Sequence, residues 1–69
     1  MAVVKQAIKE NDVVELLDGV DKWPPGTGGT VISERGEWKL IEISNTRGVA
    51  LDYVSALEPR LRLLAKHSE

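Results

Sequence analysis

The chain has 69 residues, with nine Lys and Arg against eleven Asp and Glu and a formal net charge of −2. This length allows one domain, and the negative balance disfavours general binding to phosphate backbones. With no cysteine and a single histidine, His67, the sequence excludes a disulfide scaffold and must rely on its aliphatic core.

Apolar runs in the sequence are short. None approaches the roughly 18–20 residues of a membrane span, and the N-terminus lacks the charged, apolar and small-residue sections of a signal peptide. Together with the absence of cysteine, these patterns predict a soluble, cytoplasmic protein.

The N-terminal residues 1–9 fit one side of a short helix or an edge strand, and we expect an extended or partly ordered arm. Residues 13–17 form an apolar run that predicts the first strand and stops at Asp18 and Gly19. We expect the folded domain to span residues 10–64 and a polar, frayed tail to occupy residues 65–69.

A long loop over residues 18–29 precedes a β-branched second strand over residues 30–34. Trp23 lies in this loop, directly before a run of proline and glycine. Such a run constrains the angle at which the backbone enters the next strand. The residues expected to shape this loop are Pro24, Pro25, Gly26, Gly28 and Gly29.

The next two segments predict a β-hairpin. Residues 35–37 make a tight connection with Gly36 where a positive φ is wanted, and residues 38–44 form the third strand. Alternation along that strand places Ile41 and Ile43 on one face, together with Lys39, whereas the opposite face carries Trp38, Leu40 and Glu42. Ile41 and Ile43 are therefore the predicted core residues.

After a turn over residues 45–48, a fourth strand is expected over residues 49–54. Pro59 disfavours helical backbone at the residue before it, so residues 55–59 predict a single 3₁₀ turn, and residues 60–64 predict the fifth strand. This order predicts an all-β fold, a small five-stranded SH3-like barrel. The alternative oligonucleotide-binding barrel requires a helix between strands three and four, for which residues 45–48 leave no room.

Three segments of the sequence, residues 12–16, 26–31 and 57–64, are similar to segments of a known protein family. In their order and their glycine-rich entry to a strand, they resemble a bacterial family of small SH3-like proteins of unknown function, and the entry is similar to that of KOW modules. The resemblance implies an accessory role of the antitoxin or immunity type. The chain departs from the family pattern at Gly28 and Glu34, where apolar residues are usual, which suggests a twisted or bulged second strand.

The sequence carries no pattern for catalysis or cofactor binding. The glycines at residues 26–29 lack the lysine of a phosphate-binding loop and lead into a strand. His67 is the third residue from the end of the sequence, and the acidic residues between 10 and 21 lack calcium-loop spacing. We therefore predict that the chain is no enzyme and has no cofactor or metal site.

Aromatic and acidic side chains predict a surface for another protein. Aromatic residues contribute much of the energy of protein interfaces, and acidic residues steer basic partners. The predicted partner-binding residues are Trp23, Trp38, Leu40, Tyr53, Asp18 and Asp21. Each aromatic residue also has a structural interpretation: Trp23 as a cap on one end of the barrel, Trp38 as buried under the long loop or the N-terminal arm, and Tyr53 as a rim residue. Asp52 is expected to pair with Arg47 or Arg62.

Three functions follow from these patterns. The first is a noncatalytic protein-binding module that neutralises a toxin-like or enzyme partner. The second is a KOW-like nucleic-acid module, in which Trp38 stacks on a base and five basic residues gather on one side: Arg35, Lys39, Arg47, Arg60 and Arg62. The third is a structural role as a homo-oligomer, with Val3 and Val4 adding to the sheet edge of a neighbour.

Overall fold

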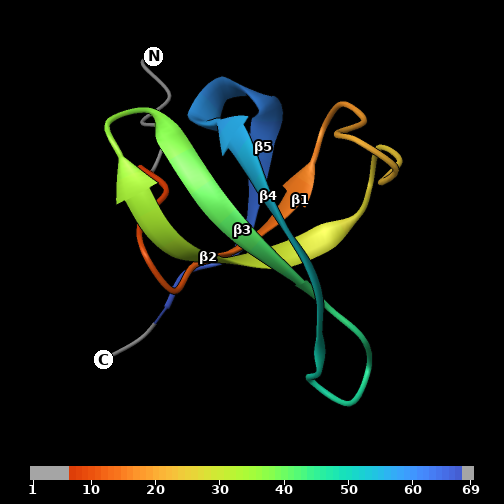
Figure 1. Cartoon of the computed structure of the whole chain (residues 1–69). Helices are drawn as coiled ribbons and strands as arrows, with labels where there is room; N and C mark the ends of the chain where they lie inside the picture. Colours follow the sequence, from red (N-terminus) through yellow and green to blue (C-terminus); the bar gives the residue numbers. More distant parts are fainter. Residues whose placement is uncertain (1–6, 68–69) are drawn as a thin grey trace.

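The computed structural model describes residues 7–67 and shows an all-β protein (Figure 1). Five strands lie in one antiparallel sheet with the order β4-β3-β2-β1-β5. One 3₁₀ turn, η1, precedes the last strand. The elements are β1 (Val13–Leu16), β2 (Gly28–Arg35), β3 (Trp38–Ser44), β4 (Ala50–Leu57), η1 (Glu58–Arg60) and β5 (Leu61–Ala65).

Strand β2 is the centre of the sheet and joins its two halves. It pairs with β1 near its start and with β3 along most of its length. The register with β3 shifts between Val31 and Ser33, so Ile32 forms a bulge, and bulges bend a strand and increase its twist. The sheet is accordingly strongly curled, and β4 and β5 are its two edge strands (Figure 1). Within residues 7–67 these two edges do not pair with each other, so the sheet is not closed.

The predicted order of strands is confirmed, but the end of the fourth strand was placed too early. Ser55, Ala56 and Leu57 were expected in the turn and instead continue β4, because they pair with Leu40, Lys39 and Trp38 of β3. The 3₁₀ turn is therefore confined to Glu58–Arg60, with Pro59 inside it.

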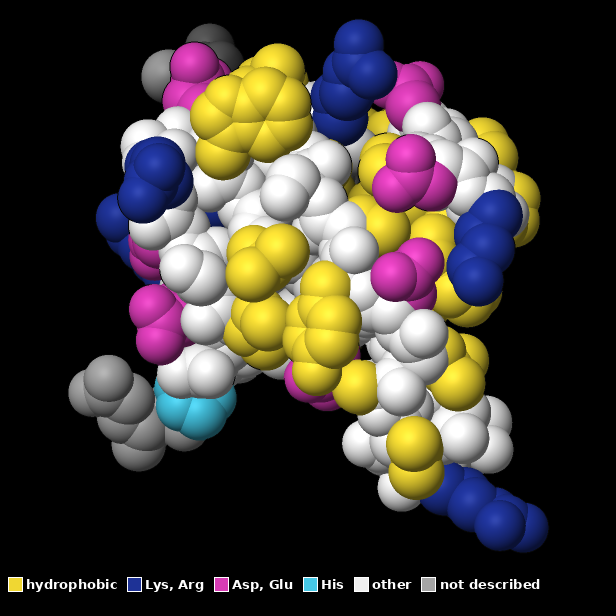
Figure 2. Space-filling view, in the orientation of Figure 1, with side chains coloured by type: hydrophobic (Ala, Val, Ile, Leu, Met, Phe, Trp, Pro, Cys, Tyr) yellow, Lys and Arg dark blue, Asp and Glu magenta, His cyan; other side chains and the backbone are white. Residues whose placement is uncertain are grey.

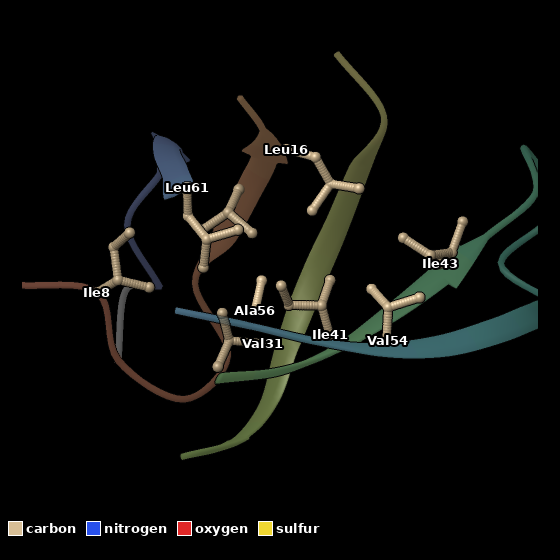
Figure 3. Packing of buried hydrophobic residues seen from close by; sticks show 9 residues of the cluster. Ile8, Leu16, Val31, Ile41, Ile43, Val54, Ala56 and Leu61 are labelled. Carbon is tan, nitrogen blue, oxygen red and sulfur yellow. The ribbon is translucent and has the colours of Figure 1, made fainter. Parts of the chain in front are cut away.

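The core lies inside the curl of the sheet (Figure 3). Every strand contributes to it, and Ile41 and Ile43 are buried as predicted. The side chains that meet there are Ile8, Val14, Leu16, Val31, Ile41, Ile43, Val54, Ala56 and Leu61.

Ile8 was placed in the N-terminal arm but is 1% exposed and packs in this core. Its amide donates to Glu58 Oε2 at 3.3 Å, and the amide of Asn11 donates to the carbonyl of Val31 at 2.6 Å. These bonds attach residues 8–11 to the sheet. Val3 and Val4 lie outside the described residues.

Asp12 connects the two ends of the described chain. Its side chain is 2% exposed and accepts hydrogen bonds from Lys66 Nζ at 2.6 Å and from the His67 amide at 2.8 Å. Burial alone raises a carboxyl pKa, but these bonds and one from the Lys9 amide outweigh it and lower the pKa of Asp12 to about 2. The expected fraying therefore does not extend to Ala65, Lys66 or His67, since Ala65 belongs to β5 and the other two hold Asp12.

Lys39, which was predicted on the core face of the third strand with Ile41, is buried as a cation. Its Nζ lies 3.2 Å from Glu34 and 3.3 Å from Glu58, and it donates to the Gly36 carbonyl at 2.9 Å. Burial lowers a lysine pKa, but these carboxylates outweigh it, and the pKa of Lys39 is raised. Lys39 thus explains why Glu34 occupies a strand position where an apolar residue was expected.

Candidate functional site

The most exposed aromatic surface of the described chain is built on the outer face of β3 and β4. Trp38 begins β3 on the face opposite Ile41 and is 52% exposed, which confirms the predicted alternation and excludes its burial under the long loop. Leu57 of β4 lies directly opposite it, and Leu40 follows on the same face, opposite Ser55. In Figure 2 hydrophobic side chains gather at the middle of this face, over β3 and β4.

Trp38 stands between two hollows and lines both of them, as does Ser55. One hollow lies toward β2 and is lined by Ser33, Glu34, Arg35, Trp38, Lys39, Leu40 and Ser55. The other lies toward the long loop and η1, has a volume of about 270 Å³, and is lined by Gly19, Val20, Trp38, Ser55, Ala56, Leu57 and Arg60. The second hollow is mainly apolar, with Arg60 at its rim. An indole between two hollows is a shape that accepts a chain lying across it.

The long loop is fixed at the side of the second hollow by backbone hydrogen bonds. Leu16 exchanges bonds with Gly26 and Thr27 at 2.7 and 2.8 Å, and Val20 and Trp23 bond to each other twice at 2.9 Å. Asp18 and Asp21 are exposed on this loop, and Asp18 lies 3.9 Å from Arg60. The loop therefore presents acidic groups next to the apolar hollow.

Gly28 and Gly29 were expected in the loop but are the first two residues of β2. Gly26 of the loop and Gly29 of β2 each have a clear steric reason. Gly26 has a φ of +90°, where a side chain would be strained. A Cβ on Gly29 would lie 2.5 Å from Ile41 Cγ2 and 2.8 Å from the Glu42 carbonyl. Gly29 thus lets β2 approach β3 closely above the core.

Trp23 has a different setting from Trp38. It is partly buried and packs against the core, and its Nε1 donates to Asp52 Oδ2 at 2.8 Å. Asp52 lies opposite Ile43, so Trp23 reaches the inner side of β4, whereas Trp38, Leu40 and Tyr53 lie on the outer side. Trp23 therefore ties the long loop to β4. This arrangement agrees with the structural interpretation of Trp23 as a cap.

Asp52 was expected to pair with an arginine, and this expectation is wrong. Its two oxygens accept the Trp23 indole N–H and, at 2.9 Å, the Tyr53 amide. These two bonds lower the pKa of Asp52 below its ordinary value. Arg62 pairs instead with Glu15 at 2.9 Å, because the two residues face each other across β5 and β1.

Tyr53 lies further along the same outer face as Trp38. It is 52% exposed and sits opposite Glu42, two positions from the pair of Leu40 and Ser55. The structure thus groups Trp38, Leu40 and Tyr53, places Asp18 and Asp21 on the neighbouring loop, and sets Trp23 apart. The residues that sequence reasoning missed are Val20 and Leu57, whose partial exposure depends on the packing of the loop and the 3₁₀ turn.

The basic residues considered for nucleic-acid binding are mostly engaged with carboxylates. Lys39 is buried between Glu34 and Glu58, Arg60 faces Asp18, and Arg62 pairs with Glu15. Among residues 7–67 no group of three or more metal-ligating side chains occurs, and no helix there has the length and apolarity to cross a membrane.

Comparisons with protein-family models, with curated proteins and with solved structures found no match for this chain. The function of the surface must be inferred from the chemistry of its own residues.

Proposed function

We propose that the chain is a noncatalytic protein-binding module with an SH3-like barrel fold. The strand order, the long loop between β1 and β2, the bulge in β2 and the 3₁₀ turn before β5 support this fold. The observation that carries the function is the half-exposed Trp38 between two hollows. An exposed indole in such a setting offers a large apolar contact at little conformational cost.

The partner is an extended segment of another protein. Its backbone lies across Trp38, and one apolar side chain fills the hollow lined by Val20, Trp38 and Leu57. Leu40 and Tyr53 extend the contact along β3 and β4. Burial of an interface tryptophan is commonly worth about 2 kcal/mol or more, so Trp38 is the main source of affinity.

The acidic residues of the loop indicate that the partner carries a positive charge. Asp18 and Asp21 are exposed, and the hollow beside them carries one arginine, Arg60, that already faces Asp18. A lysine or arginine next to the apolar anchor of the partner would meet this acidic border. Such rim charges mainly raise the association rate and lose strength in salt.

The biological setting that we propose is a cytoplasmic accessory protein of the antitoxin or immunity type, which binds and neutralises a toxin-like or enzyme partner. The support for this setting is the resemblance carried by residues 12–16, 26–31 and 57–64. A small sheet with an apolar, acid-bordered surface suits such a role because binding requires no chemistry from the module.

Selection from a displayed library of random peptides tests this proposal. The expected result is enrichment of peptides that join a basic residue to an apolar one and that lose binding to the Trp38→Ser variant. Leu64→Ser is the matched control, since Leu64 is 47% exposed but belongs to β5. Peptides that bind both variants as well as the wild type, or no enrichment at all, would contradict the proposal.

A further inference from the structure

Strand β4 has an open edge that is unusually prone to pairing. Among residues 7–67 it pairs only with β3, so its other side presents backbone N–H and C=O groups. The strand has eight residues, contains no proline or lysine, and carries a single charge, Asp52. Leu51 and Tyr53 on it are each 52% exposed. A strand of this kind is a template for adding another strand.

The geometry of Asp52 opposes that addition. One carboxylate oxygen takes the Tyr53 amide at 2.9 Å, so this N–H is occupied before any other strand arrives. The other oxygen is held at 2.8 Å by the Trp23 indole, which keeps the carboxylate in place. An incoming strand would have to break the Asp52–Tyr53 bond and remove water from an ionised group, which is costly.

A second copy of the chain is the occupant that this edge fits best. A twofold axis can bring two copies of β4 together as antiparallel neighbours. The same residues then contact each other from both copies, so the apolar side chains of one β4 meet those of the other. Asp52 is the only charge within β4 that opposes pairing of like with like. The register shift between Ile43 and Ser44 distorts β4 near Leu51, which leaves residues 52–57 as the regular part of the edge.

We propose that the outer edge of β4 is a latent pairing surface for a second copy of this chain, and that the Trp23–Asp52 pair protects it. This role goes beyond the proposed function, which uses the outer face around Trp38, although Tyr53 and Ser55 belong to both surfaces. It explains the hydrogen bond from the Trp23 indole N–H to Asp52, which packing of Trp23 against the core does not require. It also explains an aspartate in a strand that is otherwise uncharged.

Sedimentation equilibrium of the full chain over a range of concentrations tests the proposal. Asp52→Ala frees the Tyr53 amide and removes the charge, and its self-association constant is expected to exceed that of the wild type by at least about tenfold. Trp23→Phe leaves the carboxylate but removes its anchor, so a smaller increase is expected. Glu42→Gln is the matched control, because it removes one negative charge from β3 directly opposite Tyr53, away from the edge.

A second substitution locates the new contact. Ser55→Lys in the Asp52→Ala background puts a charge on the same edge, and lysine on an edge strand prevents pairing, so the protein is expected to return to wild-type association. Association of Asp52→Ala at the wild-type level, with a native circular dichroism spectrum, would overturn the proposal. So would association that Ser55→Lys does not reverse. If neither Asp52→Ala nor Asp52→Asn folds, Asp52 is a requirement for folding and the protective role is refuted.

Discussion

The buried carboxylate of Asp12 makes a quantitative prediction about stability. Its pKa is lowered from 3.8 to about 2 by hydrogen bonds from His67, Lys66 and Lys9 that outweigh its burial. At about 1.4 kcal/mol per pKa unit, ionised Asp12 stabilises the folded chain by about 2 kcal/mol. In a domain of this size that corresponds to a melting temperature higher by about 8–16 °C.

The sign follows from the direction of the shift. Because the folded pKa is lowered, the stabilisation is complete above the unfolded pKa of 3.8 and is lost as the pH falls through about 2. Asp12→Asn keeps the shape of the side chain without its charge. We expect this variant to be less stable than the wild type by about 2 kcal/mol near neutral pH, with the gap closing between about pH 4 and pH 2.

Urea unfolding of both proteins across this range measures the gap directly, since all other titrating groups are shared. Asp18→Asn is the matched control, because Asp18 is an exposed carboxylate whose side chain is 63% accessible. Its stability should follow that of the wild type at every pH. A gap between wild type and Asp12→Asn that stays constant from neutral to acid pH would refute the role given to the ionised carboxylate.

Further predictions concern the close approach of two strands, the buried lysine and nucleic acid. Gly29→Ala should destabilise the chain by about 1–3 kcal/mol in thermal melts, because its Cβ would meet Ile41 and the Glu42 backbone; wild-type stability would show that β2 and β3 can separate freely. Lys39→Met should cost about 1.5–3 kcal/mol, since Glu34 and Glu58 lose their charge-assisted contacts with Lys39; an unchanged urea midpoint would contradict the ion-pair account. Filter binding to single-stranded nucleic acid should give no retention at low salt, and retention that falls steeply with salt would instead favour the nucleic-acid hypothesis.

Local patterns in the sequence were sufficient for much of the fold. The alternation around Ile41 and Ile43 identified the buried face of β3. Gly36 indicated the hairpin turn, and its φ of +60° is the positive value that such a turn requires. The end of β4 was misplaced because residues 55–59 were interpreted together as the 3₁₀ turn, whereas pairing with β3 keeps Ser55 to Leu57 extended. Tertiary pairing overrides local preference at such boundaries.

Contacts between distant residues could not be predicted in the same way. Asp12 meets Lys66 across 54 positions, and Trp23 meets Asp52 across 29. Neither pairing leaves a local pattern, because an aspartate next to a strand or within one is normally solvated. Alternation alone placed Trp38 on the outer face of β3 but left its burial open, and the hollows beside it depend on where the long loop and η1 pack.

The central claim is that Trp38, and not Trp23, contacts the partner. Nuclear magnetic resonance separates the two indole N–H signals, and that of Trp23 is identified by its loss in Trp23→Phe. Titration with a peptide selected as above should move the Trp38 signal and the amides of Val20, Ser55 and Leu57. The Trp23 indole signal should stay in place, because that N–H is bonded to Asp52. Movement confined to Trp23, or to β5 on the other edge of the sheet, would contradict the account.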